Sequence, residues 1–428
     1  MKYIQLYLVF VGILYFVGPI EWKSNNNILL FGLIGAYQLA LYLGYKFTFK
    51  PNEKNRIEHI QADQWFINNL KYICVFTIII SILLYIRNSN NIPFRQLITN
   101  IVNFDMSSLY QVTSKAKLIA SSDKFGGKIL AYISTLSGPL FVALIPLVML
   151  YWKRVNKISK ALSLSAIFVY VMTNLLTGTN EVVFNIFMYA TVVLLIKMQV
   201  SPQKNKTIKK KRVKLLPIIL IIFVFMIFFT KNMTARTYGS YNLPISINTL
   251  DMDKWYIHFL PTRFQALLVY LSIYLCQGYY GMSLALRLPW VPTYFSGSSS
   301  FLRSNIEEIF RINISRYTYQ SRAEVFGWYS GLNWHSAYTW LANDFHWFGV
   351  VFIMLLLGAF IGSIYKDSLE TKNPIAIILL CIIFPGILFL TANNIVFAQP
   401  TTFMAFWFYL IIWLYQRHKQ KHNQRYNV

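Results

Sequence analysis

The chain is built from long apolar runs that are separated by shorter polar segments. A helix of roughly 20 residues crosses the hydrocarbon core of a membrane, so each apolar run of about 15 to 24 residues predicts one span. Ten runs meet this condition, at residues 3–20, 28–45, 72–86, 129–152, 161–177, 182–199, 215–230, 347–365, 374–391 and 402–416. The first run has no small-residue cleavage site and is soon followed by another, so we expect a retained span rather than a signal peptide.

Composition supports the same class of protein. Hydrophobic residues make up 56% of the chain and charged residues only 13%, whereas a soluble domain carries about 25% charge. We therefore predict an all-α polytopic membrane protein with about 10–12 transmembrane helices. The cysteines lie in apolar runs without metal-ligand spacing, which is typical of small buried side chains; they are Cys74, Cys276 and Cys381.

The basic residues predict the orientation. More than half of the 40 lysines and arginines fall between or beside alternate spans, as expected of cytoplasmic segments. These predicted inner segments are 46–71, 153–160, 200–214, 366–373 and the tail from Arg417, which places both termini in the cytoplasm. A net charge of +25 would also suit nucleic acid, but charge confined to short loops between spans favours contact with membrane lipids and excludes nucleic acid as the partner.

The predicted topology gives three regions: 1–230 with about seven spans, a large outer loop at 231–346, and 347–428 with about three spans and a cytoplasmic tail. Inside the loop, residues 264–286 are apolar, but another crossing would move the tail outside. We expect this stretch to dip into the outer leaflet or lie along it, with an interruption at 277–281. A second outer loop, 87–128, contains an apolar piece at 97–104 that is expected to lie in the interface.

Arginine is the preferred cation of the large outer loop. The loop has seven arginines against two lysines, and the planar guanidinium binds phosphate through two charge-assisted hydrogen bonds. The set predicts anion binding, although any single arginine could instead pair with lipid head groups or with a loop carboxylate. The arginines are Arg236, Arg263, Arg287, Arg303, Arg311, Arg316 and Arg322. Because Arg263 and Arg287 flank the apolar stretch, they are the first choices as phosphate clamps, and Arg322 and Arg236 complete the predicted diphosphate-binding set.

Three titratable residues near the end of the loop are candidates for acid–base chemistry: Glu324, His335 and Asp344. They lie among aromatic residues just before a span, where low polarity suits a general base. For His335 the alternative is a plain hydrogen bond to a backbone carbonyl. No spacing of histidines or cysteines suggests a metal, and we predict no cofactor.

Two polar patches at outer span ends could line a cavity beneath the loop. Asn180 and Glu181 form the first, and Glu181 is an ionisable residue at a span edge, where such residues tend to face a cavity. The second is 391–394 with 399–402. The alternative is that both patches only cap helix ends.

In layout the chain resembles the Wzy-type polymerases of O-antigen and related bacterial polysaccharides: many spans, one large outer loop in the second half, and a short final group of spans. Residues 270–286 look like the embedded outer helix of that family, and 335–349 look like the junction where the loop re-enters the membrane. His335 matches the histidine of the related O-antigen ligases, with a longer spacing to Gly349. Where the family often has Gly-Thr-Arg, this chain has Gly178, Thr179 and Asn180.

The resemblance implies a glycosyltransferase of the bacterial inner membrane that needs neither nucleotide sugar nor metal. It would transfer a growing chain from undecaprenyl diphosphate to a hydroxyl of the next lipid-linked repeat unit. A flippase and a chain-length regulator would be its pathway partners. The alternatives are an O-antigen ligase, another polyprenyl-phosphate-dependent glycosyltransferase, and a flippase or transporter. A transporter is disfavoured by the long outer loop and by the lack of an internal repeat.

Overall fold

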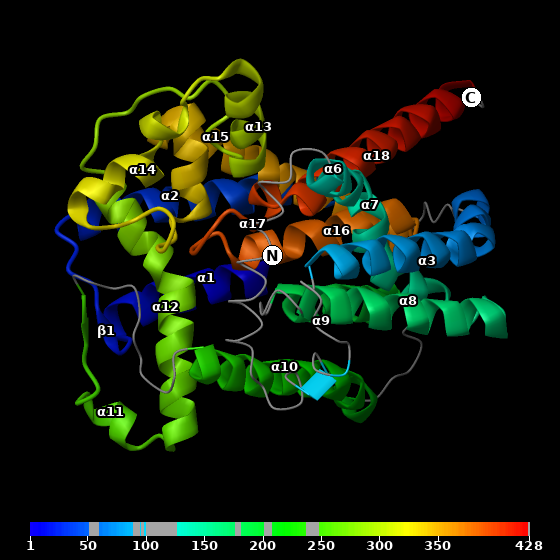
Figure 1. Ribbon diagram of the computed structural model, residues 1–428, viewed down its shortest axis with the longest axis horizontal. Helices are drawn as coiled ribbons and strands as arrows, with labels where there is room; N and C mark the ends of the chain where they lie inside the picture. Colours follow the sequence, from blue (N-terminus) through cyan, green and yellow to red (C-terminus); the bar gives the residue numbers. More distant parts are fainter. Residues whose placement is uncertain are drawn as a thin grey trace. The chain divides into compact units, whose positions relative to one another are not determined.

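The computed structural model describes residues 1–50, 60–88, 95, 98–99, 126–175, 181–200, 208–236 and 248–426 (Figure 1). The apolar piece at 97–104 and the patch residues 178–180 therefore lie wholly or mostly outside the described residues. The chain divides into two compact units, each assembled from three separate segments. The first unit comprises Met1–Lys50, Ser240–Lys366 and Ile383–Gln399, and the second comprises Pro51–Gly239, Asp367–Ile382 and Pro400–Val428.

Helices dominate both units. The first unit contains α1 (Lys2–Val17), α2 (Asn27–Thr48), α11 (Trp255–His258), α12 (Thr262–Ala285), α13 (Ser300–Phe310), α14 (Tyr319–Arg322), α17 (Ile395–Ala398) and most of α15 (Ala337–Glu370). Its short 3-10 turns are η1 (Ser315–Tyr317) and η2 (Ala323–Phe326), and its two-residue strands β1 (Ile20–Glu21) and β2 (Thr249–Leu250) pair antiparallel. The second unit contains α3 (Ile60–Asn88), α6 (Gly126–Leu136), α7 (Gly138–Tyr151), α8 (Lys157–Leu175), α9 (Glu181–Val200), α10 (Ile208–Arg236) and α18 (Pro400–Tyr426). Helix α16 (Pro374–Leu388) contributes to both units.

Every predicted span coincides with a helix or, for residues 129–152, with the consecutive helices α6 and α7. Among the described residues, six segments are long and apolar enough to cross a membrane: Asn27–Thr48, Asp63–Arg87, Ile129–Tyr151, Lys157–Leu175, Glu181–Val200 and Ala337–Glu370. Three shorter apolar helices accompany them, at Lys2–Val17, Ile222–Thr234 and Pro374–Leu388. The chain is an all-α polytopic membrane protein, as the hydropathy pattern predicted, and the three cysteines are buried as expected.

Glycines allow α2 and α15 to pack with their backbones almost touching. A Cβ atom added to Gly44 of α2 would lie 2.0 Å from the Leu355 carbonyl oxygen, and one on Gly358 of α15 would lie 2.1 Å from the Leu41 carbonyl oxygen. No larger residue fits at either position without moving a backbone. Such small-residue contacts are a common way of packing helices inside a membrane, where the hydrophobic effect gives little attraction between apolar helices.

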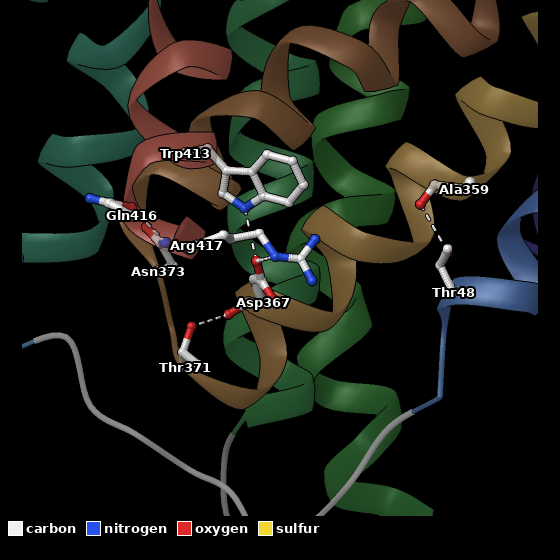
Figure 2. Close-up of polar contacts among 8 residues, drawn as sticks. All are labelled: Thr48, Ala359, Asp367, Thr371, Asn373, Trp413, Gln416 and Arg417. Carbon is white, nitrogen blue, oxygen red and sulfur yellow. Dashed lines mark hydrogen bonds and ion pairs between the residues drawn. The ribbon is translucent and has the colours of Figure 1, made fainter. Parts of the chain in front are cut away.

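Hydrogen bonds fix the direction of this helix pair. Tyr37 donates its hydroxyl to the Trp347 carbonyl oxygen at 2.8 Å, and Thr48 donates to the Ala359 carbonyl oxygen at 2.8 Å (Figure 2). Residue numbers rise together along both helices, so α2 and α15 run parallel. Parallel packing agrees with the predicted topology, in which both helices cross from the outer to the inner side.

Helix α12 occupies the apolar stretch predicted at 264–286. It packs against α1 and α2 and is drawn across both of them in Figure 1 rather than alongside. This direction favours the arrangement in which the helix lies along the membrane surface. The interruption predicted at 277–281 is wrong, because α12 is continuous through it. Gly278 instead lets the helix approach another backbone, since an added Cβ would lie 2.3 Å from the Thr391 carbonyl oxygen.

The first unit joins residues that are far apart in the sequence. Tyr7 of α1 donates its hydroxyl to the Leu388 carbonyl oxygen at 2.6 Å. Strand β2, in the segment Ser240–Lys366, pairs with β1, which comes just after α1 in the sequence. The first unit is therefore completed only by residues near the C-terminal end of the sequence.

Polar contacts in the second unit join segments that were predicted to share the inner side. Asp63 accepts hydrogen bonds from the Tyr151 hydroxyl at 2.6 Å and from Arg154 Nη1 at 2.9 Å. At the end of α15, Asp367 accepts a 2.8 Å hydrogen bond from Trp413 Nε1, and the Arg417 guanidinium stacks on the Trp413 ring (Figure 2). These contacts place Asp63 of the predicted inner segment 46–71 beside Arg154 of 153–160, and Asp367 of 366–373 beside Arg417 of the tail.

Candidate functional site

The last part of the large loop folds onto the first turns of α15, and Asp344 lies at the centre of this contact. Its carboxylate accepts hydrogen bonds from the Thr293 hydroxyl, from the Gly297 N–H at 3.1 Å, and from both the N–H and the hydroxyl of Ser298. Four donors therefore occupy its two oxygens. Asp344, predicted as a possible base, thus organises the loop at 293–298.

Backbone strain is concentrated on both sides of Asp344. Tyr294, Phe295 and His346 adopt φ values of 50°, 64° and 59°, which for residues other than glycine cost on the order of 1–3 kcal/mol each. The strained His346 interrupts α15, and its ring packs edge-on against Trp290 with 5.4 Å between centroids. The hydrogen bonds to Asp344 hold the strained loop in place. Strain of this kind is often found at functional sites.

Asn343, which the sequence did not single out, connects three parts of the loop. It is buried, and its amide nitrogen donates to the Gly297 carbonyl oxygen at 3.2 Å and to Gln320 Oε1 at 2.9 Å. Its oxygen accepts the Tyr319 N–H at 2.8 Å. A buried asparagine with all these partners is a structural link, and it fixes α14 against the loop.

Two of the predicted phosphate-binding arginines make contacts that join the end of α12 to α14 and η2. Arg322 donates from Nη1 to the Pro289 carbonyl oxygen at 2.7 Å, and the Arg287 guanidinium lies 4.4 Å from the Phe326 ring centroid. Arg287 is exposed and Arg322 is half-buried. Neither forms an ion pair with a carboxylate within the described ranges, so both charges are available to an external anion.

Arg263 does not join this pair. It lies in the first turn of α12, exposed, at the opposite end from Arg287. A rise of 1.5 Å per residue separates the two backbones by roughly 36 Å along the helix, much more than the length of a diphosphate. Arg263 and Arg287 therefore cannot hold the same diphosphate, and the role of Arg263 as a separate phosphate clamp stays a prediction.

Arg303 is an arginine whose importance the sequence did not reveal. Its guanidinium lies 5.5 Å from the Trp340 ring centroid, and its Nε and Nη1 atoms are buried without a hydrogen-bond partner among the described residues. Burial lowers the pKa of the Arg303 guanidinium, and the charges of Glu307 and Asp344 oppose this shift. The seven arginines looked alike in the sequence, because nothing in it places Trp340 beside one of them.

His335 is unsuited to proton transfer. Only 1% of its surface is exposed, and burial lowers its pKa to about 3, an effect that the backbone of Gly281 offsets only in part. The imidazole is therefore neutral at physiological pH, and a base of such low pKa accepts protons poorly. A role for His335 in packing against α12 fits these properties better than the predicted catalytic role.

Glu324 is the best placed of the three predicted titratable residues. It is exposed in η2, between Arg322 and the Phe326 ring that contacts Arg287. The N–H and hydroxyl of Ser330 both donate to its Oε1 atom. Its Oε2 atom receives no hydrogen bond from the described part of the chain, so one carboxylate oxygen remains open to an incoming hydroxyl.

The polar patch at 391–394 lies against the loop. Asn394 donates from its amide nitrogen to the Ser298 carbonyl oxygen at 2.6 Å and also caps α17. Asn393 Oδ1 accepts a hydrogen bond from Trp340 Nε1 at 3.1 Å. This patch therefore caps a helix, which is one of the two predicted roles, and it also contacts the loop. That it lines a cavity stays a prediction.

The remaining predicted site residues belong to the second unit. Glu181 is exposed in the first turn of α9, and Arg236 is the last residue of α10. Asn180 and the side chain of Arg236 lie outside the described residues. These three stay predictions.

Comparison with known proteins identifies no relative. No protein-family model matches the chain, and no curated protein or solved structure matches it either. The function must therefore be inferred from the residues of this chain.

Chemically, the site combines two capacities. Arg287, just after α12, and Arg322 of α14 offer two positive charges without a carboxylate partner in the described part of the chain. An anion can be held there by charge-assisted hydrogen bonds. Glu324 offers a carboxylate oxygen in the same group of residues. Together they suit a reaction in which an anionic group leaves while a hydroxyl is deprotonated.

Proposed function

We propose that this protein is a glycosyltransferase of the bacterial inner membrane that polymerises oligosaccharide repeat units carried on undecaprenyl diphosphate. Its product would be O-antigen or a similar surface polysaccharide, made at the outer face of the membrane. The observation that carries the proposal is that Arg287 and Arg322, where the end of α12 contacts η2 and α14, have no carboxylate partner within the described residues. Figure 1 draws α12 across α1 and α2, against which it packs. A lipid-linked diphosphate presents its charge at this kind of membrane surface.

In the proposed reaction the acceptor hydroxyl of one lipid-linked unit attacks the anomeric carbon of the growing chain. The new C–O bond forms as the bond to the diphosphate oxygen breaks, and the hydroxyl proton passes to Glu324. Negative charge develops on the departing diphosphate, and Arg287 and Arg322 stabilise it. Fixed charges that meet developing charge usually make the largest contribution to catalysis.

The proposed setting follows from the charge pattern. Both termini would be cytoplasmic, because the segments rich in lysine and arginine would be retained inside. The large loop would then meet substrate that a flippase has delivered to the outer leaflet, and a chain-length regulator would act on the product.

The proposal predicts that each arginine of the pair is needed for polymer. A deletion strain complemented with Arg287→Ala or Arg322→Ala should lose the long polysaccharide ladder. Loss of one charge-stabilising donor typically costs about 2.7–4 kcal/mol in the barrier, or a factor of about 10² to 10³ in rate. The measurement is gel electrophoresis of extracted polysaccharide, with protein levels checked by immunoblot.

Arg316→Ala is the matched control. Arg316 is exposed in the same loop and contacts the ring and hydroxyl of its neighbour Tyr317, so its replacement should leave the ladder intact. Wild-type ladders from both Arg287→Ala and Arg322→Ala would refute the assignment. The deletion itself distinguishes the nearest alternative, because a lipid core bearing a single repeat unit indicates a polymerase and a bare core indicates a ligase.

A further inference from the structure

The unpaired guanidinium of Arg303 is the least satisfied charged group in the described part of the loop. Buried N–H groups without an acceptor cost roughly 1–3 kcal/mol each, more when charged, so they are normally paired. Here Nε and Nη1 of Arg303 are both buried and unpaired. The residue as a whole is only half-buried, as are Trp340, Asp344 and Asn393 nearby, so the two buried atoms lie just beneath the surface of the loop.

The surroundings of Arg303 are rich in groups that bind carbohydrate. The indole of Trp340 carries the guanidinium on one face and donates its N–H to Asn393 Oδ1. Asn393 lies next to Asn394, which bonds the Ser298 carbonyl oxygen. An aromatic ring with a guanidinium over one face and an amide at its edge offers both a stacking surface and directional hydrogen bonds.

The charge balance argues against an anion at this position. Two carboxylates, Asp344 and Glu307, interact with the single charge of Arg303. Both carboxylates accept hydrogen bonds from neutral groups: Asp344 from the 293–298 loop, and Glu307 from the N–H and hydroxyl of Ser315. A phosphate here would meet more negative than positive charge, whereas a neutral oxygen acceptor would satisfy the free N–H groups without repulsion.

We propose that Arg303, Trp340 and Asn393 form a binding site for a neutral sugar ring, through its hydroxyl or N-acetyl carbonyl oxygens. The inference rests on the proposed function in taking that sugar from a lipid-linked repeat unit. It divides the loop into two parts: Arg287 and Arg322 bind the diphosphate, and the Arg303 site binds the uncharged sugar.

The experiment uses the purified full-length protein in lipid nanodiscs. The probes are the methyl glycosides of glucose and N-acetylglucosamine, which carry no charge, and inorganic diphosphate. Binding is measured by saturation-transfer NMR for the glycosides and by calorimetry for diphosphate. Arg303→Met and Trp340→Leu should each weaken glycoside binding about tenfold or more, since tenfold is 1.4 kcal/mol, the usual scale of one hydrogen bond to a charged group. Both variants should bind diphosphate with unchanged affinity.

Controls separate this site from the arginine pair and from misfolding. Arg303→Lys keeps the charge but lacks the planar fork, so it should also weaken glycoside binding, while Arg316→Met should not. Arg287→Met should show the reverse selectivity, with diphosphate binding lost and glycoside binding kept. Each variant must elute as a single species with a wild-type melting temperature, and Trp340→Leu provides the test if Arg303→Met does not fold.

The proposal is overturned if neither glycoside binds the wild-type protein, or if Arg303→Met binds the glycosides as tightly as the wild type does. It is also overturned if Arg303→Met loses diphosphate binding and keeps glycoside binding. Its failure is distinguishable from failure of the proposed function. Suppose that glycoside binding depends on Arg303 but deletion of the gene leaves the polysaccharide ladder intact. The sugar site would then stand, and the polymerase function would be rejected.

Discussion

Asp344 and His335 use their polar atoms in opposite ways. The Asp344 carboxylate is fully occupied by donors from the 293–298 loop, while both ring nitrogens of His335 lack a well-formed hydrogen bond among the described residues. The first side chain fixes the geometry of the site, and the second fills space against Gly281 of α12. Of the three titratable residues that the sequence suggested, Glu324 alone combines exposure with a free oxygen.

The low pKa of His335 predicts a pH dependence of stability. The unfolded chain protonates this histidine near pH 6.5, whereas the folded protein does so only near pH 3, so the unfolded state binds more protons between these values and stability falls as the pH decreases. The contribution is on the order of 4 kcal/mol by pH 3. Thermal unfolding from pH 7 to pH 4 should therefore show a shallower loss of melting temperature in His335→Gln than in the wild type.

His258→Gln is the control for this experiment, because His258 is an exposed histidine at the end of α11. Its replacement should leave the wild-type slope unchanged. Equal slopes in the wild type and His335→Gln would show that the buried imidazole does not resist protonation.

At the scale of elements, close backbone contact determines how the first unit packs. Gly44 and Gly358 bring α2 and α15 together, and Gly278 does the same for α12 against residues 391–392. These contacts make the helices direct neighbours of the loop residues that they support. They also explain why α12 contains glycines without being broken by them.

This packing predicts a sharp difference between glycines of the same helix. Gly44→Ala and Gly358→Ala each force a methyl group into a facing backbone, which should cost about 1–3 kcal/mol or more as overpacking. Gly35 of α2 has no atom within 4 Å of an added Cβ, so Gly35→Ala should be neutral or stabilise the helix by up to about 1 kcal/mol. Melting temperatures in one detergent compare the three variants, and an equal loss in Gly35→Ala would contradict the packing.

How much was predictable differs between the elements and the site. Hydropathy alone located the spans, because a membrane imposes one length and one polarity on every helix that crosses it. The site depends on contacts between residues far apart in the chain, such as Arg303 with Trp340, and no local pattern encodes these. The separation of Arg263 from Arg287 was missed for a related reason: the two arginines flank one segment, but an unbroken helix places them at opposite ends.

For the whole molecule, the contacts within each unit agree with the predicted topology, in which the segments between spans lie alternately on the inner and the outer side of the membrane. In the second unit Asp63 pairs with Arg154, and Asp367 pairs with Arg417, so these residues of segments predicted to be inner lie together. In the first unit α2 and α15 run parallel, as two spans that cross in the same direction must. These contacts test which segments lie on the same side of the membrane. The excess of lysine and arginine then indicates which of the two sides is proposed to be cytoplasmic.

Cysteine labelling tests that direction. The three native cysteines are buried, so a membrane-impermeant maleimide should react with introduced cysteines at exposed positions. In spheroplasts we expect Ser304→Cys to be labelled at once, and Lys372→Cys and Lys419→Cys only after permeabilisation. Immediate labelling of Lys372→Cys with protection of Ser304→Cys would invert the proposed topology.

The bond between Tyr7 and Leu388 has a consequence for biosynthesis. Its two residues are 381 positions apart, and ribosomes add roughly 5–20 residues per second, so α1 waits on the order of 20–75 s for this partner to be made. During that time its polar tyrosine must be tolerated by lipid or shielded by an insertion factor. A nascent chain released before residue 388 cannot complete the first unit, and we expect cellular quality control to recognise such a chain by its first helix.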